Sequence, residues 1–302
     1  MVITKIDMVE VEYLDGSPSR IGTVFIPSYE RMLWKALAEH EPREAEESVS
    51  SGKIAYALAR HYNWPEEDVE LSTWSGFLHD VGKRGIHLNV LNKPGSFTPK
   101  ERIYMGLHVE LSRILLDPFY PQFYAPLFHA LEVPEPYPTL NEILYGLGIP
   151  SQIIDARDAL ARQRKDGEYL IQYNNGTVIA HTPSSLCAAQ RAFIAGNHHM
   201  RDKYPYNVND PLFNLERMSF DDAKPGGIPM RQHIVVIQLI QAIDGMLATK
   251  RPYREGAVPF QTVLSETEKI FANGDDPYLH TSEDTKKIVG LAAPSGYDLD
   301  GR

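Results

Sequence analysis

The stretch FLHDVGK, residues 77–83, places His79 and Asp80 side by side and a lysine three residues after the aspartate. Adjacent residues on a helix face different directions, so the two side chains would not normally meet. An ionised carboxylate behind an apolar run is costly to bury unless it is paired or bound to a metal. Either the pair is an accident of a buried helix, or both residues serve one metal centre. The burial cost favours the second interpretation for Asp80.

The composition indicates a folded globular protein and disfavours several classes of partner. Of 302 residues, 43% are hydrophobic and 23% are charged, and the formal net charge is −10. That bias disfavours a nucleic acid polymer or an anionic membrane as partner. The single cysteine, Cys187, excludes an internal disulfide framework and a multi-thiolate zinc site. The first residues do not resemble a signal peptide, and no apolar run reaches the ~20 residues of a membrane span. We expect a cytoplasmic protein.

The chain divides into a short β-rich start and a long helical part. Residues 1–28 alternate around Asp15–Pro18 and predict an N-terminal β-ribbon. Residues 29–290 predict one helical domain, and residues 291–302 a tail. Within that domain, residues 117–184 are rich in proline and aromatic residues and contain Asn175-Gly176, a strong hairpin signal. The predicted fold is an all-α helical bundle with an N-terminal β-ribbon and an inserted segment that contains a β-hairpin.

Apolar periodicity and capping signals locate the helices. We predict helices over residues 28–40, 44–62, 66–83, 100–116, 184–199 and 230–249. Thr98 and Pro99 are the expected N-cap and first residue of the fourth, with Glu101 in its first turn. Residues 85–98, around Pro94-Gly95, are predicted to form a loop.

Six potential metal ligands fall on these helices or at their ends: His79, Asp80, His108, His198, His199 and Asp244. A helical bundle can project such ligands inward toward one centre. Imidazole and carboxylate ligands without thiolates suit iron, manganese or catalytic zinc, and this many ligands could hold two ions. The alternatives are that His108 is an ordinary core histidine, that the His198-His199 pair arises by chance, and that Asp244 starts a polar turn.

Three basic residues are candidates for holding a phosphate: Lys83, Arg251 and Arg254. In KRPYRE, residues 250–255, the two arginines are three apart and would share one side of a helical turn. A pair of guanidinium groups suits a phosphate. The alternative is a solvated helix end.

Four segments together resemble the HD-GYP branch of the HD metal-dependent phosphohydrolases. They are LHDVGKRGIHLNVLNKPGSFTPKE (78–101), GLHVELSRILL (106–116), GNHHMRDKYPY (196–206) and RPYRE (251–255). The resemblance covers roughly residues 45–116 and 185–272.

The resemblance implies an all-helical HD domain with a centre of two or three metal ions, usually iron or manganese, and for this chain we expect two divalent ions. The implied activity is hydrolysis of the bacterial second messenger cyclic di-GMP by metal-activated water, to the linear dinucleotide or to GMP. The implied metal ligands are His79, Asp80, His108, His198 and His199, with Asp80 able to bridge both ions. Lys83 would face the scissile phosphate, which makes Asp80 and Lys83 the catalytic pair. Arg251, Arg254 and Tyr204 would bind the substrate.

The chain also departs from the family pattern. Ser50 stands where the family has its first histidine, and Glu46, one turn earlier, could reach a metal instead. Residues 203–205 read KYP rather than GYP. The family's closing aspartate falls on Ala242, and Asp244 is the nearest acid. The segment 117–184 is inserted between His108 and His198.

Three functions remain open from the sequence. The first is a metal-dependent phosphodiesterase acting on cyclic di-GMP or a related nucleotide. The second is a degenerate member that binds the nucleotide, or a protein partner through the insertion, as a signalling effector. The third is an HD phosphohydrolase with another phosphorylated substrate. The retained His79, Asp80 and Lys83 favour an enzyme, because an unneeded buried carboxylate is costly.

Overall fold

The computed structural model describes part of the chain. The backbone is described for residues 9–11, 20–22, 28–116, 133–148, 160–163, 169–172, 178–181, 186–199, 226–247, 250–251, 254–255, 258–271 and 286. Side chains are described for residues 32–116, 133–148, 190–199, 226–247 without 231 and 244, 258–267, and 286. The predicted tail, residues 291–302, lies outside these ranges, as do residues 117–132 of the predicted insertion.

The described part of the chain is mostly helical, as predicted. The longer helices are α1 (Ser28–His40), α2 (Pro42–His61), α3 (Glu66–Leu78), α5 (Pro99–Leu116), α10 (Leu186–Asn197), α12 (Met230–Leu247) and α13 (Phe260–Phe271). Shorter ones are the 3-10 helix η1 (Val81–Gly85), α4 (Leu88–Leu91) and α8 (Leu140–Gly146). Of the helices described, none is both long and apolar enough to cross a bilayer.

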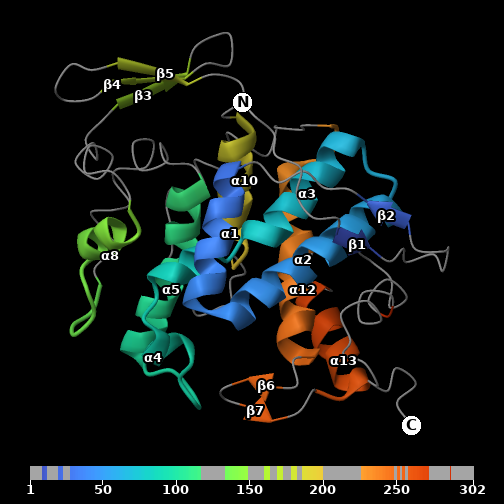
Figure 1. The fold of residues 1–302 in the computed structure, drawn as a ribbon. Coiled ribbons are helices and arrows are strands. Elements are labelled where there is room, and N and C mark those ends of the chain that lie inside the picture. The colour runs from blue at the N-terminus through green and yellow to red at the C-terminus, as the bar shows by residue number, and fades with distance from the viewer. Residues whose placement is uncertain are drawn as a thin grey trace.

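Short antiparallel strands lie at the edges of this helical body (Figure 1). Strand β1 (Val9–Val11) pairs with β2 (Arg20–Gly22). Strands β3 (Leu160–Gln163), β4 (Tyr169–Gln172) and β5 (Val178–His181) form a sheet in that order, with Asn175-Gly176 between β4 and β5. Strand β6 (Lys250–Arg251) pairs with β7 (Arg254–Glu255). The prediction that KRPYRE forms a helical turn is therefore wrong, because Arg251 and Arg254 are cross-strand partners.

The start of α5 follows from its sequence. The Thr98 amide donates to Glu101 Oε2 over 2.6 Å, and the Glu101 amide lies 3.3 Å from Thr98 Oγ1. This reciprocal pair satisfies two amides that a helix start leaves without helical partners. Pro99, which has no amide hydrogen, is the first helical residue. The predicted start is confirmed, whereas the predicted loop before it contains the short helix α4.

The end of α3 differs from the prediction in a way that shapes the site. The helix ends at Leu78 rather than continuing to residue 83. His79 caps it with φ −56° and ψ −29°, and Asp80 then turns away with φ −106° and ψ 11°. The chain then continues as the 3-10 helix η1. His79 and Asp80 therefore lie at a junction between two helices, and neighbouring residues there can face one centre.

A close approach between η1 and α5 packs this junction onto the core. A Cβ at Gly82 would lie 2.0 Å from the His108 carbonyl oxygen and 2.4 Å from the Ser112 amide nitrogen. The Gly82 amide donates to Ser112 Oγ over 2.8 Å. Residues around this contact form one buried apolar cluster with α1, α4 and α8, while α2, α12 and α13 share another. Only glycine fits position 82 without moving the backbone of α5.

Candidate metal centre

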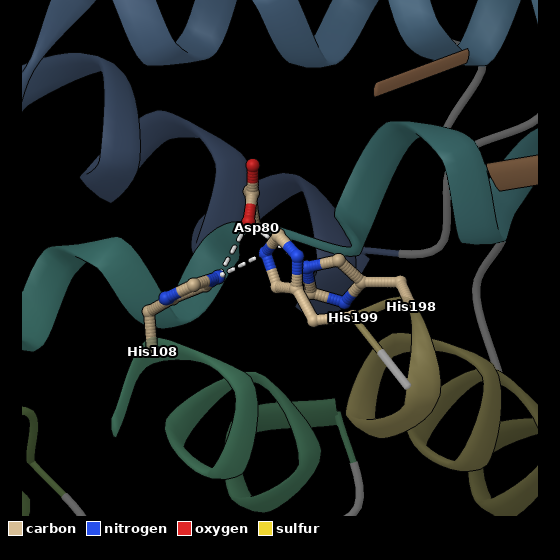
Figure 2. A group of neighbouring side chains, drawn as sticks. All are labelled: Asp80, His108, His198 and His199. Carbon is tan, nitrogen blue, oxygen red and sulfur yellow. Dashed lines mark hydrogen bonds and ion pairs between the residues drawn. The ribbon is translucent and has the colours of Figure 1, made fainter. Parts of the chain in front are cut away.

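Four side chains from three distant segments meet at one buried point (Figure 2). Asp80 comes from the junction after α3, His108 from α5, and His198 and His199 from the turn that follows α10. One ligand atom of each lies within 4.8 Å of the others. The structure thus brings together four of the predicted metal ligands.

The backbone fixes which nitrogen three of the histidines present. Each has Nδ1 at a carbonyl three residues earlier: His79 at Gly76 (2.8 Å), His108 at Met105 (2.6 Å) and His198 at Ala195. A carbonyl oxygen can only accept, so Nδ1 carries the proton. In the neutral ring Nε2 then keeps its lone pair, as a metal ligand requires.

One oxygen of Asp80 and three imidazole nitrogens lie close to one another. Asp80 Oδ1 lies 3.3 Å from His108 Nε2 and 3.5 Å from His198 Nε2. Asp80 Oδ1 and His198 Nε2 are buried and have no hydrogen-bond partner among the residues described. His199 Nε2 lies 3.2 Å from His108 Nε2. A carboxylate oxygen and imidazole nitrogens gathered at one point are ligand types that a divalent cation can take.

The other oxygen of Asp80 faces a different set of groups. Asp80 Oδ2 lies 3.1 Å from His79 Nε2 and 2.8 Å from Lys83 Nζ, and accepts from Gln241 Nε2 over 3.4 Å. His79, also a predicted ligand, therefore lies next to the cluster, in contact with Asp80. One oxygen of Asp80 therefore contacts His108 and His198, and the other contacts His79 and Lys83.

Lys83 is held by a second buried acid that the sequence analysis did not single out. Glu44, on α2 and only 3% exposed, lies 2.5 Å from Lys83 Nζ through Oε2 and 2.9 Å from Arg43 through Oε1. Burial opposes charge on Lys83, but Asp80 and Glu44 outweigh it and raise the pKa of its ammonium group. Burial likewise opposes charge on Glu44, but the facing Lys83 holds its pKa below the ordinary value.

The same electrostatics set the charge of the cluster. Burial opposes ionisation of Asp80, yet the surrounding His79 and Lys83 bring the pKa of this carboxyl well below its usual range. Burial, together with the neighbouring imidazoles, lowers the pKa of His198 to about 4 and that of His199 well below its ordinary value. An ionised carboxylate with neutral imidazoles is the protonation state that metal binding needs.

The remaining predicted residues are placed differently. Glu46 is exposed on α2, because two residues on a helix are about 200° apart and Glu44 faces inward. Asp244 lies on α12, but its side chain lies outside the described residues, as does all of Tyr204. Arg251 and Arg254 stand opposite each other in β6 and β7, with only their backbone described.

Spacing in the sequence could have pointed to two of the groups found here. Glu44, Ser48, Ser51 and Ala55 are buried at intervals of four, three and four along α2. Counting back from the apolar stripe would therefore have selected Glu44 rather than Glu46. Gln241 is a polar residue within the apolar run of α12, which is unusual for a buried helix face.

Comparison with known proteins agrees with this geometry. Residues 45–132 match the family model of the HD domain. The matched segment contains His79, Asp80 and His108, whereas His198 and His199 lie beyond it. Searches of the curated proteins and of the solved structures give no match. The HD match supports the HD phosphohydrolase superfamily, and with the His/Asp cluster it indicates a metal-dependent phosphohydrolase.

Proposed function

We propose that the protein is a metal-dependent phosphodiesterase of the HD-GYP type that hydrolyses cyclic di-GMP or a related nucleotide. The observation that carries the proposal is the cluster of Asp80, His108, His198 and His199, whose ligand atoms lie within 4.8 Å of one another and could hold a metal ion. The HD match supports the hydrolase class, and the motifs of residues 78–116, 196–206 and 251–255 support the choice of substrate.

Two divalent ions, iron or manganese, are the proposed cofactors. His108, His198 and His199 would hold one with Asp80 Oδ1, and His79 would hold the other with Oδ2, because the two oxygens face these different imidazoles. Asp244 is proposed as a further ligand from α12. When bound, such ions supply Lewis-acid activation of water and neutralise charge on a phosphate.

Lys83 is proposed as a fixed positive charge that orients the scissile phosphate. Its raised pKa means that the ammonium group keeps its proton at neutral pH, so it does not act as a base. Its ties to Glu44 and Asp80 restrict where the charge lies. Arg251, Arg254 and Tyr204 are proposed to hold the rest of the substrate. The paired backbone of β6 and β7 keeps the two arginines adjacent.

Two other functions would use the same site. One is hydrolysis of another phosphorylated substrate. The HD match favours it, because the match ends at residue 132 and does not include the segments at 196–206 and 251–255 that resemble the HD-GYP branch. The other is binding of cyclic di-GMP or a protein partner without hydrolysis, which Ser50 in place of a histidine favours.

The test combines metal content with hydrolysis. Protein purified without chelators is analysed for metals beside Asp80→Ala, with the exposed Glu46→Ala as matched control. Two equivalents of iron or manganese, lost in Asp80→Ala only, together with conversion of cyclic di-GMP, support the proposal. Metal with hydrolysis only of other phosphate esters points to another substrate. Absence of metal in the wild type contradicts the enzyme proposal.

A further inference from the structure

The end of α10 is held by side chains from two other helices. Arg113 Nη2 donates to the Gly196 carbonyl over 3.0 Å and to Asn197 Oδ1 over 3.2 Å. From α12, Gln238 Nε2 donates to the Asn197 carbonyl over 3.3 Å. The last carbonyls of a helix have no helical partners, and here α5 and α12 supply donors to two of them.

The Arg113 side chain is buried and lies in close contact with the end of α10. Its side chain is 2% exposed and lies across Gly196, where a Cβ would fall 1.5 Å from its Nε. Asn197 is fixed in turn, because its Nδ2 donates to the Phe193 carbonyl over 2.7 Å. A buried guanidinium needs acceptors, and the C-terminal end of a helix provides them with a favourable dipole.

This arrangement determines how two consecutive histidines reach one centre. If α10 continued, His198 and His199 would point about 100° apart. Instead the helix stops at Asn197, the residue that Arg113 holds, and the next two residues form a turn. Both rings then face Asp80 and His108, with ring centroids of His198 and His199 4.2 Å apart.

We propose that Arg113 is a positioning residue that holds the turn carrying His198 and His199 in its metal-binding geometry. It lies five residues after His108 on α5, so one helix carries a ligand and also orients the other two. Arg113 acts through the backbone of Gly196 and the side chain of Asn197. The proposal rests on the proposed metal centre, although its effect on the turn does not require a bound ion.

The experiment uses the full chain and three variants. Arg113→Met removes the guanidinium and keeps much of the side-chain length, and Arg113→Lys restores the charge. Leu58→Ala, in the other core cluster, serves as a control that lowers stability away from the site. Amide hydrogen exchange over residues 190–199 is measured on metal-free protein. Binding of Mn²⁺ and the visible spectrum of the Co²⁺ form are measured on each variant.

Arg113→Met is expected to speed exchange across residues 194–199. It should also weaken Mn²⁺ binding by about 10- to 100-fold and alter the Co²⁺ spectrum, the effect typical of losing a partner that orients ligands. Arg113→Lys should recover part of the protection from exchange and part of the Mn²⁺ affinity. Leu58→Ala should leave Mn²⁺ affinity unchanged. In a His198→Ala background, Arg113→Met should weaken Mn²⁺ binding less than it does in the wild type.

Unchanged exchange and unchanged Mn²⁺ affinity in Arg113→Met overturn the proposal. Equal weakening in Leu58→Ala also overturns it, because the effect would then reflect stability alone. If the wild type binds no metal, the proposed function fails, and the exchange measurement alone decides whether Arg113 holds the turn.

Discussion

Substituting Gly82 with alanine tests the contact that joins η1 to α5. The added Cβ would lie 2.0 Å from the His108 carbonyl oxygen, whereas ordinary contact begins at 3.4 Å. The obstacle is backbone, so no side-chain rotation relieves it, and α5 or η1 has to move by roughly 1.4 Å to restore ordinary contact. Overpacking of this kind costs about 1–3 kcal/mol, and loss of the Gly82 hydrogen bond to Ser112 adds about 1 kcal/mol.

The same displacement should disturb the metal centre, because His108 belongs to the contact and Asp80 lies two residues before Gly82. We expect Gly82→Ala to lower the free energy of unfolding by about 2–4 kcal/mol in urea titration and to weaken Mn²⁺ binding by at least tenfold. The matched control is Gly146→Ala at the end of α8, where a Cβ meets nothing within 4 Å. A Gly82→Ala protein with wild-type stability and Mn²⁺ affinity would refute the reasoning.

Three further predictions concern buried charge and bound metal. Glu44→Gln leaves Lys83 without its second acid and should destabilise the protein by about 2 kcal/mol in urea titration, whereas the exposed Glu46→Gln should change little. Burial lowers the pKa of His233 against the opposing effect of Asp68, so the unfolded chain takes up this proton first. The stability that this group contributes is present above its unfolded pKa of about 6.5 and is lost as pH falls. His233→Gln should therefore reduce the loss of unfolding free energy between about pH 7.5 and about pH 5.5, measured by unfolding curves at the two pH values. Chelation should lower the melting temperature and added Mn²⁺ should restore it, because Mn²⁺ at 100 times its Kd stabilises the folded state by about 2.7 kcal/mol. An unchanged melting temperature would count against a bound ion.

The sequence predicted the helices well because their signals are local. The start of α5 depends on Thr98, Pro99 and Glu101, which lie within four residues of one another. The end of α3 could not be predicted in this way. No proline or capping signal marks Leu78 as the last residue, and the neighbouring Gly82 packs on α5 through Ser112, a contact thirty residues away in the sequence.

The sequence predicted the four residues of the cluster but not the groups that support them. His79, Asp80, His108, His198 and His199 were selected by their residue types together with the resemblance to HD-GYP segments, since buried His233 and Asp68 have the same residue types and lie outside the cluster. Supporting groups such as Glu44 and Gln241 have ordinary residue types and become meaningful only once α2 and α12 are placed beside the junction. Arg251 and Arg254 were predicted to be neighbours for the wrong reason, since a strand pair rather than a helical turn joins them.

The position of the ligands at helix ends bears on what the centre binds first. His79 follows the last residue of α3 and His198 the last residue of α10, so the C-terminal ends of both helices are at the site. Such ends carry partial negative charge and favour cations over anions. Asp80 adds a full negative charge, and Lys83 is already balanced by Glu44. A phosphate ester alone therefore meets an unfavourable field, and we expect the proposed substrate, cyclic di-GMP, to bind only after the metal. Calorimetric titration of the chelated protein should show no binding, and tight binding without metal would contradict this order.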